Sequence, residues 1–285
     1  MKKRRIAASV LGAALALFSL AALDSPAIAA SDCIITPVGS TLVLANNCFT
    51  DVTITVPDGF TLDGGGHTIT AQDPVAGHFV GAVISNLTAA STIHVTNVTI
   101  TATLGDVCDA GVNRLRGILL SGASGTVTNT NVTQLRQGLS GCQEGNAIEA
   151  RNFFPDEALS SATRTQVSIT DNHVDRYQKT GILVNGDVDA IVGRNLVEGD
   201  GPITFIAQNG IQIGFGATAL VSANSISGNN YTPTTFFSCG ILIIQTAGVD
   251  AKPQDNLFPP NNAPNQNERD LCTFSKGGNY EPFGR

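Results

Sequence analysis

The sequence contains no tryptophan, one methionine and three tyrosines. The lack of tryptophan argues mildly against a dedicated carbohydrate-binding module. Lysine and arginine are absent from residues 30–113, although that stretch has seven acidic residues. After Asp24 no segment shows the apolar period of an amphipathic helix. These absences argue against a helical fold and leave short strands as the main building element.

The N-terminal segment has the features of a secretory signal peptide. Basic residues at positions 2–5 precede an apolar, alanine-rich run over 6–23, and Ala27 and Ala29 supply the small residues that signal peptidase requires. The run is near the lower length limit of a membrane-spanning helix, and a charged residue follows it at once. We therefore expect residues 1–29 to be removed and the protein to be secreted to the extracellular space, without a stable membrane anchor.

The chain that remains after this cleavage is acidic. Its formal net charge is near −10, because the removed segment takes four basic residues and one acidic residue from a chain of net charge −7. Such a surface is a poor partner for nucleic acid. Eight of its twelve basic residues lie between Arg114 and Arg194, so the positive charge is concentrated in the middle of the chain.

Six cysteines follow the signal segment, in the exported part of the chain, where disulfides persist. Six cysteines allow fifteen pairings, so the connectivity is open. Sequential pairing would close an N-terminal cap, join neighbouring repeats and fix the C-terminal tail through Cys33–Cys48, Cys108–Cys142 and Cys239–Cys272. No Cys-x-x-Cys spacing or nearby histidine cluster indicates a metal site.

An internal repeat is the strongest pattern in the chain. Five segments begin at a small residue followed by isoleucine, and their starts are 30, 34, 29 and 30 residues apart: Gly117-Ile-Leu-Leu, Ala147-Ile-Glu-Ala, Gly181-Ile-Leu-Val, Gly210-Ile-Gln-Ile and Gly240-Ile-Leu-Ile. This period indicates a solenoid in which each rung, one full turn of the chain, holds three strands and three turns. We predict an all-β domain of about eight rungs over residues 30–252. An irregular capping tail is expected over 253–285.

Asparagines recur at one turn of the repeat. Asn131, Asn195 and Asn224 each lie fourteen residues after a segment start, and Asn172 takes this place in the rung that carries an insertion. Stacked rungs would align these amides into a buried ladder in which neighbours satisfy one another's hydrogen bonds.

Several motifs accompany the repeat. The motif toward the N-terminus is Thr-Leu-Asp-Gly-Gly-Gly-His-Thr-Ile at 61–69, and later units lie within the repeat at 169–174, 177–182 and 208–213. From about Thr41 to about Ile244 the chain resembles the right-handed parallel β-helix repeat proteins, the pectate-lyase-like group. This resemblance implies a single right-handed parallel β-helix. The fold includes polysaccharide lyases, glycoside hydrolases, uronate epimerases and members without known activity, so it does not decide the function.

The catalytic signatures of those enzyme groups are missing. The sequence has neither the adjacent aspartates and Arg-Ile-Lys element of polygalacturonase-like members nor the paired arginines around a proline that pectate lyases share. Alginate epimerase motifs are also absent. An enzymatic activity would therefore need a site of another composition.

Period-two alternation places a candidate ligand-binding face on the repeated strands. If the isoleucine after each small residue points inward, three columns of side chains point outward. They are Leu119, Glu149, Leu183, Gln212 and Leu242; Ser121, Arg151, Asn185, Gly214 and Ile244; and Leu115, Gly145, Lys179, Gln208 and Ser238. The middle rungs of this face are polar and its ends are apolar, a pattern that fits a groove for a sugar chain.

The polar side chains of this face are candidates for chemistry on an anionic sugar. We predict Lys179, Glu149 and Arg176 to be catalytic, with the lysine or arginine as the base that abstracts a proton beside a carboxylate. Arg151 or a bound Ca²⁺ would neutralise that carboxylate. The predicted substrate-binding residues are Arg151, Asn185, Gln208, Gln212 and Tyr231. The alternative is that all of these are ordinary solvated side chains on a sheet.

A glycoside hydrolase would need a second carboxylate near Glu149. Asp175 and Asp187 are possible companions, but the repeat places neither on these outward columns. Hydrolysis is therefore the weaker enzymatic hypothesis.

The leading hypothesis is a secreted lyase-type enzyme that acts on an anionic extracellular polysaccharide or cell-wall glycan. The alternative is a non-catalytic cell-envelope protein that binds glycan or forms a rigid rod. A third hypothesis, a threonine face that binds a crystalline surface such as ice, would need regular threonine columns, which the later rungs do not continue. An enzyme should bring Lys179 and Glu149 together in a cleft, whereas a binding or structural protein should keep them apart.

Overall fold

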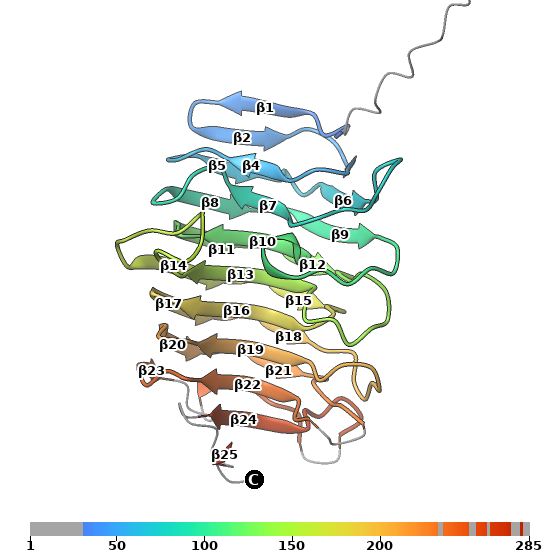
Figure 1. The fold of residues 1–285 in the computed structure, drawn as a ribbon, viewed down its shortest axis with the longest axis vertical. Coiled ribbons are helices and arrows are strands. Elements are labelled where there is room, and N and C mark those ends of the chain that lie inside the picture. Colours follow the sequence, from blue (N-terminus) through green and yellow to red (C-terminus); the bar gives the residue numbers. More distant parts are fainter. Residues whose placement is uncertain (1–30, 233–235, 251–254, 261–262, 275–279, 282–285) are drawn as a thin grey trace, which may run out of the picture.

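The computed structural model describes residues 31–232, 236–250, 255–260, 263–274 and 280–281. The predicted signal peptide and part of the predicted tail lie outside these residues. The described chain is a parallel β-helix of about seven turns (Figure 1), close to the eight rungs expected, and the all-β solenoid is confirmed. It contains one 3₁₀ turn, η1 (Gly111–Asn113). None of its helices is long and apolar enough to cross a membrane.

Three sheets, here called A, B and C, run along the whole solenoid. Sheet A contains β3 (Cys48–Thr50), β6 (Thr68–Gln72), β9 (Thr99–Thr103), β12 (Asn131–Thr133), β15 (His173–Asp175), β18 (Leu196–Glu198) and β21 (Ser225–Ser227). Sheet B contains β1 (Ile35–Val38), β2 (Thr41–Leu44), β5 (Thr61–Asp63), β8 (Thr92–Thr96), β11 (Ser124–Thr128), β14 (Thr165–Thr170), β17 (Val188–Gly193), β20 (Thr218–Ser222) and β23 (Val249–Asp250). Sheet C contains β4 (Ile54–Val56), β7 (Ala82–Asn86), β10 (Arg116–Ser121), β13 (Asn146–Asn152), β16 (Thr180–Gly186), β19 (Asn209–Gly214), β22 (Cys239–Ile244), β24 (Arg269–Phe274) and β25 (Tyr280–Glu281).

Strands that follow one another in a sheet are parallel and come from successive rungs, as β10, β13 and β16 illustrate. The relative strand direction changes at the two ends, where β1 pairs antiparallel with β2 and β25 pairs antiparallel with β24. The predicted tail is not irregular throughout, because β24 pairs in parallel with β22 and extends sheet C.

The repeated isoleucines form one side of the core. Ile84, Ile118, Ile148, Ile182, Ile211 and Ile241 follow one another in register along sheet C and are almost fully buried. Each contributes about 1.5–3 kcal/mol by leaving water. Because a single rung cannot bury this row of side chains, the repeat itself requires the rungs to stack.

A buried asparagine ladder follows the corner between sheets B and A. Its members are Asn172, Asn195, Asn224 and Asn256, and each Oδ1 atom of Asn195, Asn224 and Asn256 accepts from the backbone N–H and the Nδ2 of the preceding member at 2.9–3.1 Å. The prediction that Asn131 belongs to this ladder is wrong. Asn131 pairs with His173, one position later, and Thr130 takes the ladder position by donating to Oδ1 of Asn172.

The small residue at the start of each repeated strand shifts the alternation by one position. A Cβ atom on Gly117 would lie 2.4 Å from the carbonyl oxygen of Ala147 and 2.9 Å from Cγ1 of the core residue Val132. Gly117 and Ile118 therefore both face inward, and Arg116 before them faces outward. The third predicted column is wrong at Leu115, which belongs to the hydrophobic core, whereas the next residue, Arg116, lines a groove on the outward face. The outward column instead contains Ala82, Arg116, Asn146, Thr180, Asn209 and Cys239.

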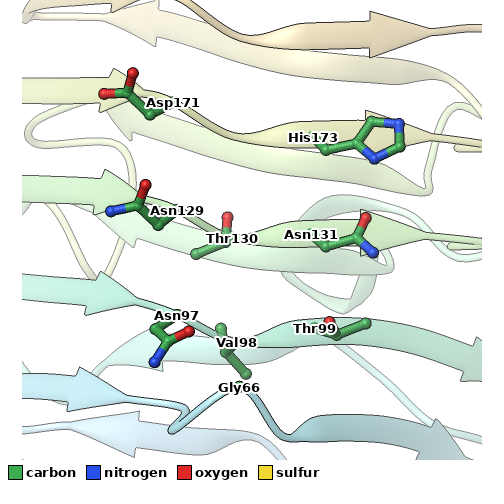
Figure 2. Close-up of a pocket in the computed structure, with 9 residues that line it drawn as sticks. All are labelled: Gly66, Asn97, Val98, Thr99, Asn129, Thr130, Asn131, Asp171 and His173. Atoms are coloured by element: carbon green, nitrogen blue, oxygen red, sulfur yellow. The ribbon is translucent and has the colours of Figure 1, made fainter.

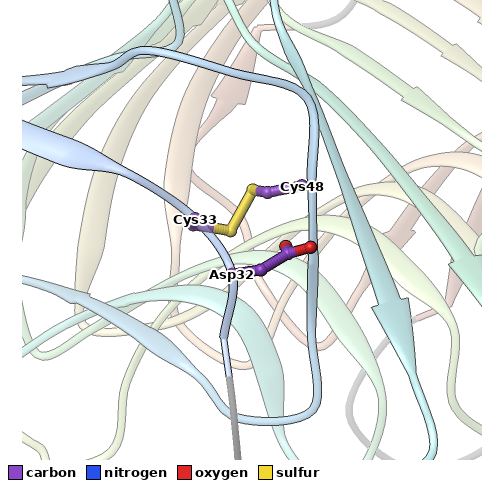
Figure 3. Close-up of side chains that lie close together, drawn as sticks. All are labelled: Asp32, Cys33 and Cys48. Atoms are coloured by element: carbon purple, nitrogen blue, oxygen red, sulfur yellow. A yellow bond between two sulfur atoms is a disulfide. The ribbon is translucent and has the colours of Figure 1, made fainter.

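The three predicted disulfides are confirmed. Cys33–Cys48 closes the N-terminal end beside Asp32 (Figure 3), Cys108–Cys142 joins the loops of two rungs, and Cys239–Cys272 joins β22 to β24. Three disulfides are compatible with the predicted extracellular location.

Candidate functional site

The outward face of sheet C carries a groove over its N-terminal rungs, which we call the sheet C groove. It has a volume of about 400 Å³ and is lined by Thr53, Thr55, Gly81, Ala82, Ser85, Asn86, Leu87, Val112, Arg116, Leu119, Ser121, Arg151, Glu157, Ala158 and Leu159. Hydroxyl groups and aliphatic side chains lie next to one another on this surface. The groove can therefore offer hydrogen bonds and apolar contacts to one ligand.

The groove exists because two rungs carry long loops at opposite ends of the sheet C strands. Its floor includes Thr55, Ser85 and Leu119, which are in register across β4, β7 and β10. One wall is Val112 in η1. The other wall is Leu159 in the insertion at 153–164. The carbonyl oxygen of Leu159 accepts a hydrogen bond from Oγ of Ser121 at 2.7 Å.

Four charged side chains of alternating sign form a continuous chain at the groove. Nε of Arg116 donates to Oε2 of Glu149 at 2.7 Å, and Nη1 of Arg151 donates to Oε1 of the same carboxylate at 3.2 Å. Nε and Nη2 of Arg151 both donate to Glu157, which makes this pair bidentate. The two positive and two negative charges therefore compensate one another; Arg116, Arg151 and Glu157 line the groove, and Glu149 is buried against the two arginines.

Glu149 is almost fully buried, and both of its oxygens are occupied. Nδ2 of Asn146 donates a third hydrogen bond to it at 2.9 Å. Burial by itself would raise the pKa of Glu149, but the charges of Arg116 and Arg151 outweigh burial, and the pKa is lowered. A carboxylate that stays ionised and fully hydrogen-bonded is a poor general acid and a poor nucleophile. Its contacts are those of a structural ion pair.

Arg116 is not among the predicted site residues, because alternation counted from Ile118 places it inside the solenoid. Its side chain is 1% exposed and also donates to the backbone carbonyls of Gly111, Val112 and Arg114, which holds the wall loop in place. One signal in the sequence could have located this column. A polar residue precedes the small starter in four successive repeats, at Arg116, Asn146, Thr180 and Asn209.

Ser85 is a second groove residue that the repeat pattern alone does not single out. It is 6% exposed, and its Oγ atom has no hydrogen-bond partner among the described residues. Leaving a buried hydroxyl unpaired costs about 1–3 kcal/mol. Because Ser85 lines the groove, a bound ligand is a natural partner for this hydroxyl.

Lys179, the predicted base, does not line the groove. Its Nζ atom donates to the carbonyl oxygen of Ala207 at 2.5 Å, and burial lowers its pKa to about 8. Within the described part of the chain, no ion pair joins Lys179 to Glu149, whose partners are Arg116 and Arg151. The arrangement that we expect of an enzyme is thus not found at this pair.

Two other predicted residues also lie away from the groove. Gln208 is fully buried, and its side-chain amide donates to the carbonyl oxygen of Tyr177 and accepts from the backbone N–H of Asp200. Its predicted place on the outward face is wrong, for the reason given for its column. Arg176 is exposed directly after β15 of sheet A, where it donates to Asp175 and Thr133.

No family model matches this chain, and neither a curated protein nor a solved structure matches it.

The first two predicted columns have the expected register on sheet C. Of the predicted substrate-binding residues, Arg151 lines the groove, whereas Asn185, Gln212 and Tyr231 do not. Asn185 pairs with Arg151 one strand further along, and its Oδ1 atom is buried without a partner among the described residues. Tyr231 lies in a loop, where it forms a bridge with Ile203.

A second hollow, of about 270 Å³, follows the corner between sheets B and A. Figure 2 shows Asn97, Asn129 and Asp171 at equivalent places on successive rungs of this corner. Their φ angles are 54°, 51° and 61°, a conformation that asparagine and aspartate tolerate better than other side chains. The turn of the backbone therefore explains this column without a ligand.

In the described part of the chain, potential metal ligands lie close together in two groups, Asp32 with Cys33 and Cys48 (Figure 3) and Glu144 with Cys108 and Cys142. Both pairs of sulfur atoms are joined in disulfides, so neither group offers thiolates. Among the described residues of the sheet C groove, both carboxylates are paired with arginine, which leaves no free carboxylate for Ca²⁺.

Proposed function

We propose that this protein is a secreted β-helix protein that binds an extracellular polysaccharide in the sheet C groove without cleaving it. The observation that carries the proposal is the ion-pair chain of Arg116, Glu149, Arg151 and Glu157. In this chain each charged group is paired with another, so that none is available as a general acid or base. What is left is a shaped surface for binding.

A saccharide suits this surface chemically. A sugar ring presents hydroxyl groups at its edge and C–H groups on its faces, and the groove has hydroxyls at Thr55 and Ser85 beside the aliphatic Leu119 and Leu159. The resemblance to the pectate-lyase-like group supports the same ligand class, because that group includes many proteins that act on polysaccharides. This support comes from the fold alone, which hosts several functions.

Filling the groove tests this function. Leu119→Trp places an indole on the groove floor, and Leu220→Trp adds the same ring to the outward face of β20, where Leu220 is 44% exposed. We expect binding to a responsive glycan, found by screening immobilised polysaccharides, to fall at least tenfold in Leu119→Trp and to stay unchanged in Leu220→Trp. Equal binding by both variants contradicts the proposal.

One observation favours a second candidate function, a lyase in which Lys179 is the base. Burial lowers the pKa of Lys179 to about 8, close to the range in which a lysine can accept a proton from substrate. The test is the ultraviolet absorbance of unsaturated products from anionic polysaccharides, with and without Ca²⁺. Product formed by the wild type and abolished in Lys179→Ala supports the lyase, and absence of product on every polymer removes it.

A further inference from the structure

Resting on the proposed function, we infer that the sheet C groove selects neutral saccharides over uronates and other anionic sugars, and that Ser85 provides the hydroxyl that orients the ligand. The basic residues of the middle rungs suggest an anionic ligand, whereas this inference assigns the groove a neutral one. Three features of the groove carry it: the state of its two arginines, the place of Glu157, and the unpaired hydroxyl of Ser85.

The four hydrogen bonds that Arg116 makes within the protein leave one of its five N–H groups, too few for the usual forked arrangement with a sugar carboxylate. Its Nε atom is bound to Glu149, Nη1 donates to the carbonyls of Val112 and Arg114, and Nη2 donates to the carbonyl of Gly111. Each nitrogen of the guanidinium thus has a partner inside the protein.

Arg151 is occupied in the same way. Its Nε and Nη2 atoms form the bidentate pair with Glu157, and its Nη1 atom is bound to Glu149. Specific recognition of a carboxylate favours a bidentate guanidinium, and here the protein's own Glu157 holds that place. A uronate could take this side of the guanidinium only by displacing Glu157.

Glu157 also sets the charge that a ligand meets at the rim. Its side chain is 23% exposed and it lines the groove, whereas that of Glu149 is 4% exposed. The most accessible charge beside the groove is therefore negative, and it repels a uronate. A neutral sugar meets no such penalty, and its hydroxyl groups can donate hydrogen bonds to the Glu157 carboxylate.

Ser85 supplies the uncompensated polar contact. Its buried Oγ atom, on the groove floor between Thr55 and Leu119, has no partner among the described residues. A sugar hydroxyl can both donate and accept, so it can pair with a serine hydroxyl in either direction. A rigid floor strand holds this group in one place, which favours recognition of a specific hydroxyl.

The experiment compares matched neutral and uronate oligosaccharides by isothermal titration calorimetry, for example galacto- and galacturono-oligosaccharides and their gluco- and glucurono- counterparts. For the wild type we expect the neutral member of a responsive pair to bind at least tenfold more tightly. Ser85→Ala should weaken that binding by roughly 3- to 10-fold. Ser168→Ala, which removes a hydroxyl from the outward face of β14, should leave it unchanged.

Glu157→Gln is the decisive variant, because it keeps the shape of the rim and releases the charge of Arg151. We expect this variant to gain at least tenfold in affinity for the uronate oligosaccharide and to change little for the neutral one. Tighter binding of the uronate by the wild type overturns the inference and leaves the proposed binding function intact. Failure of every oligosaccharide and polysaccharide to bind overturns both.

Discussion

At the scale of single residues, Glu149 lies buried between two guanidinium groups. The stability of the groove therefore depends on the compensation of these charges. Replacing Glu149 by glutamine leaves Arg116 without a counter-ion in a site that water does not reach. We expect Glu149→Gln to lower the free energy of unfolding by about 3–5 kcal/mol, measured by urea denaturation. The control is Glu198→Gln, since Glu198 pairs with His173 at the surface, and its cost should be below about 1 kcal/mol. Equal effects of the two variants would contradict this role for Glu149.

Glu144 gives the molecule a pH dependence of the opposite sign to that of a salt-bridged acid. It is fully buried, and its carboxylate accepts backbone N–H groups of Asp109 and Leu115. Burial raises its pKa, and the nearby carboxylate of Asp109 acts in the same direction. The stability from this residue is therefore present below the usual glutamate pKa and is lost as pH rises through the raised value.

The measurement is urea denaturation of the wild type and Glu144→Gln across pH 4–8. The wild type should lose stability relative to the variant as pH rises, with a slope of at most about 1.4 kcal/mol per pH unit, the value for one proton. A constant difference between the two proteins would mean that Glu144 does not titrate in this range.

The asparagine ladder separates two residues that look alike in the sequence. Asn195→Ala removes the acceptor of both nitrogens of Asn172 and a donor to Ile169, so we expect it to cost about 3 kcal/mol. Asn131→Ala, outside the ladder, should change stability by less than about 1 kcal/mol. Thermal denaturation of both variants measures these losses of stability. A larger loss in Asn131→Ala than in Asn195→Ala would indicate that Asn131 belongs to the ladder.

At the scale of the strand, the small residue that opens each repeat decides which side chains face the groove. Gly117→Ala would force a Cβ atom against the Ala147 carbonyl and Val132, so we expect a loss of about 1–3 kcal/mol. Ala147→Gly, at the equivalent position of the next rung, should cost only about 0.5–1 kcal/mol. Chemical denaturation measures the stability of both variants. An unchanged free energy of unfolding in Gly117→Ala would show that the strand start is not packed as described.

The same strand start explains what could be predicted of the elements and what could not. Strand spacing and the inward isoleucines follow from the repeat, because both depend on burial that recurs every rung. The outward position of Arg116 does not follow from strict alternation, since Gly117 and Ile118 are both inward. The same shift accounts for the buried position of Gln208, which precedes the small starter by two residues.

At the scale of the whole molecule, the fold was predictable because every rung repeats the same solution to burying its apolar side chains. The groove was only partly predictable, because it depends on features that occur once: η1 with Val112, the insertion with Glu157 and Leu159, and ion pairs between β10 and β13. Glu149 and Arg151 were correctly placed on one face, but the partners that neutralise them were not expected. Those partners are the reason that we propose binding and not catalysis.

The most direct test of this account is a crystal structure of the protein soaked with an oligosaccharide that binds in solution. The account predicts intact sugar rings over β4, β7 and β10, between Val112 and Leu159, with a sugar hydroxyl within hydrogen-bond distance of Oγ of Ser85. Sugar bound beside Lys179, or a chain cleaved at the groove, would contradict it.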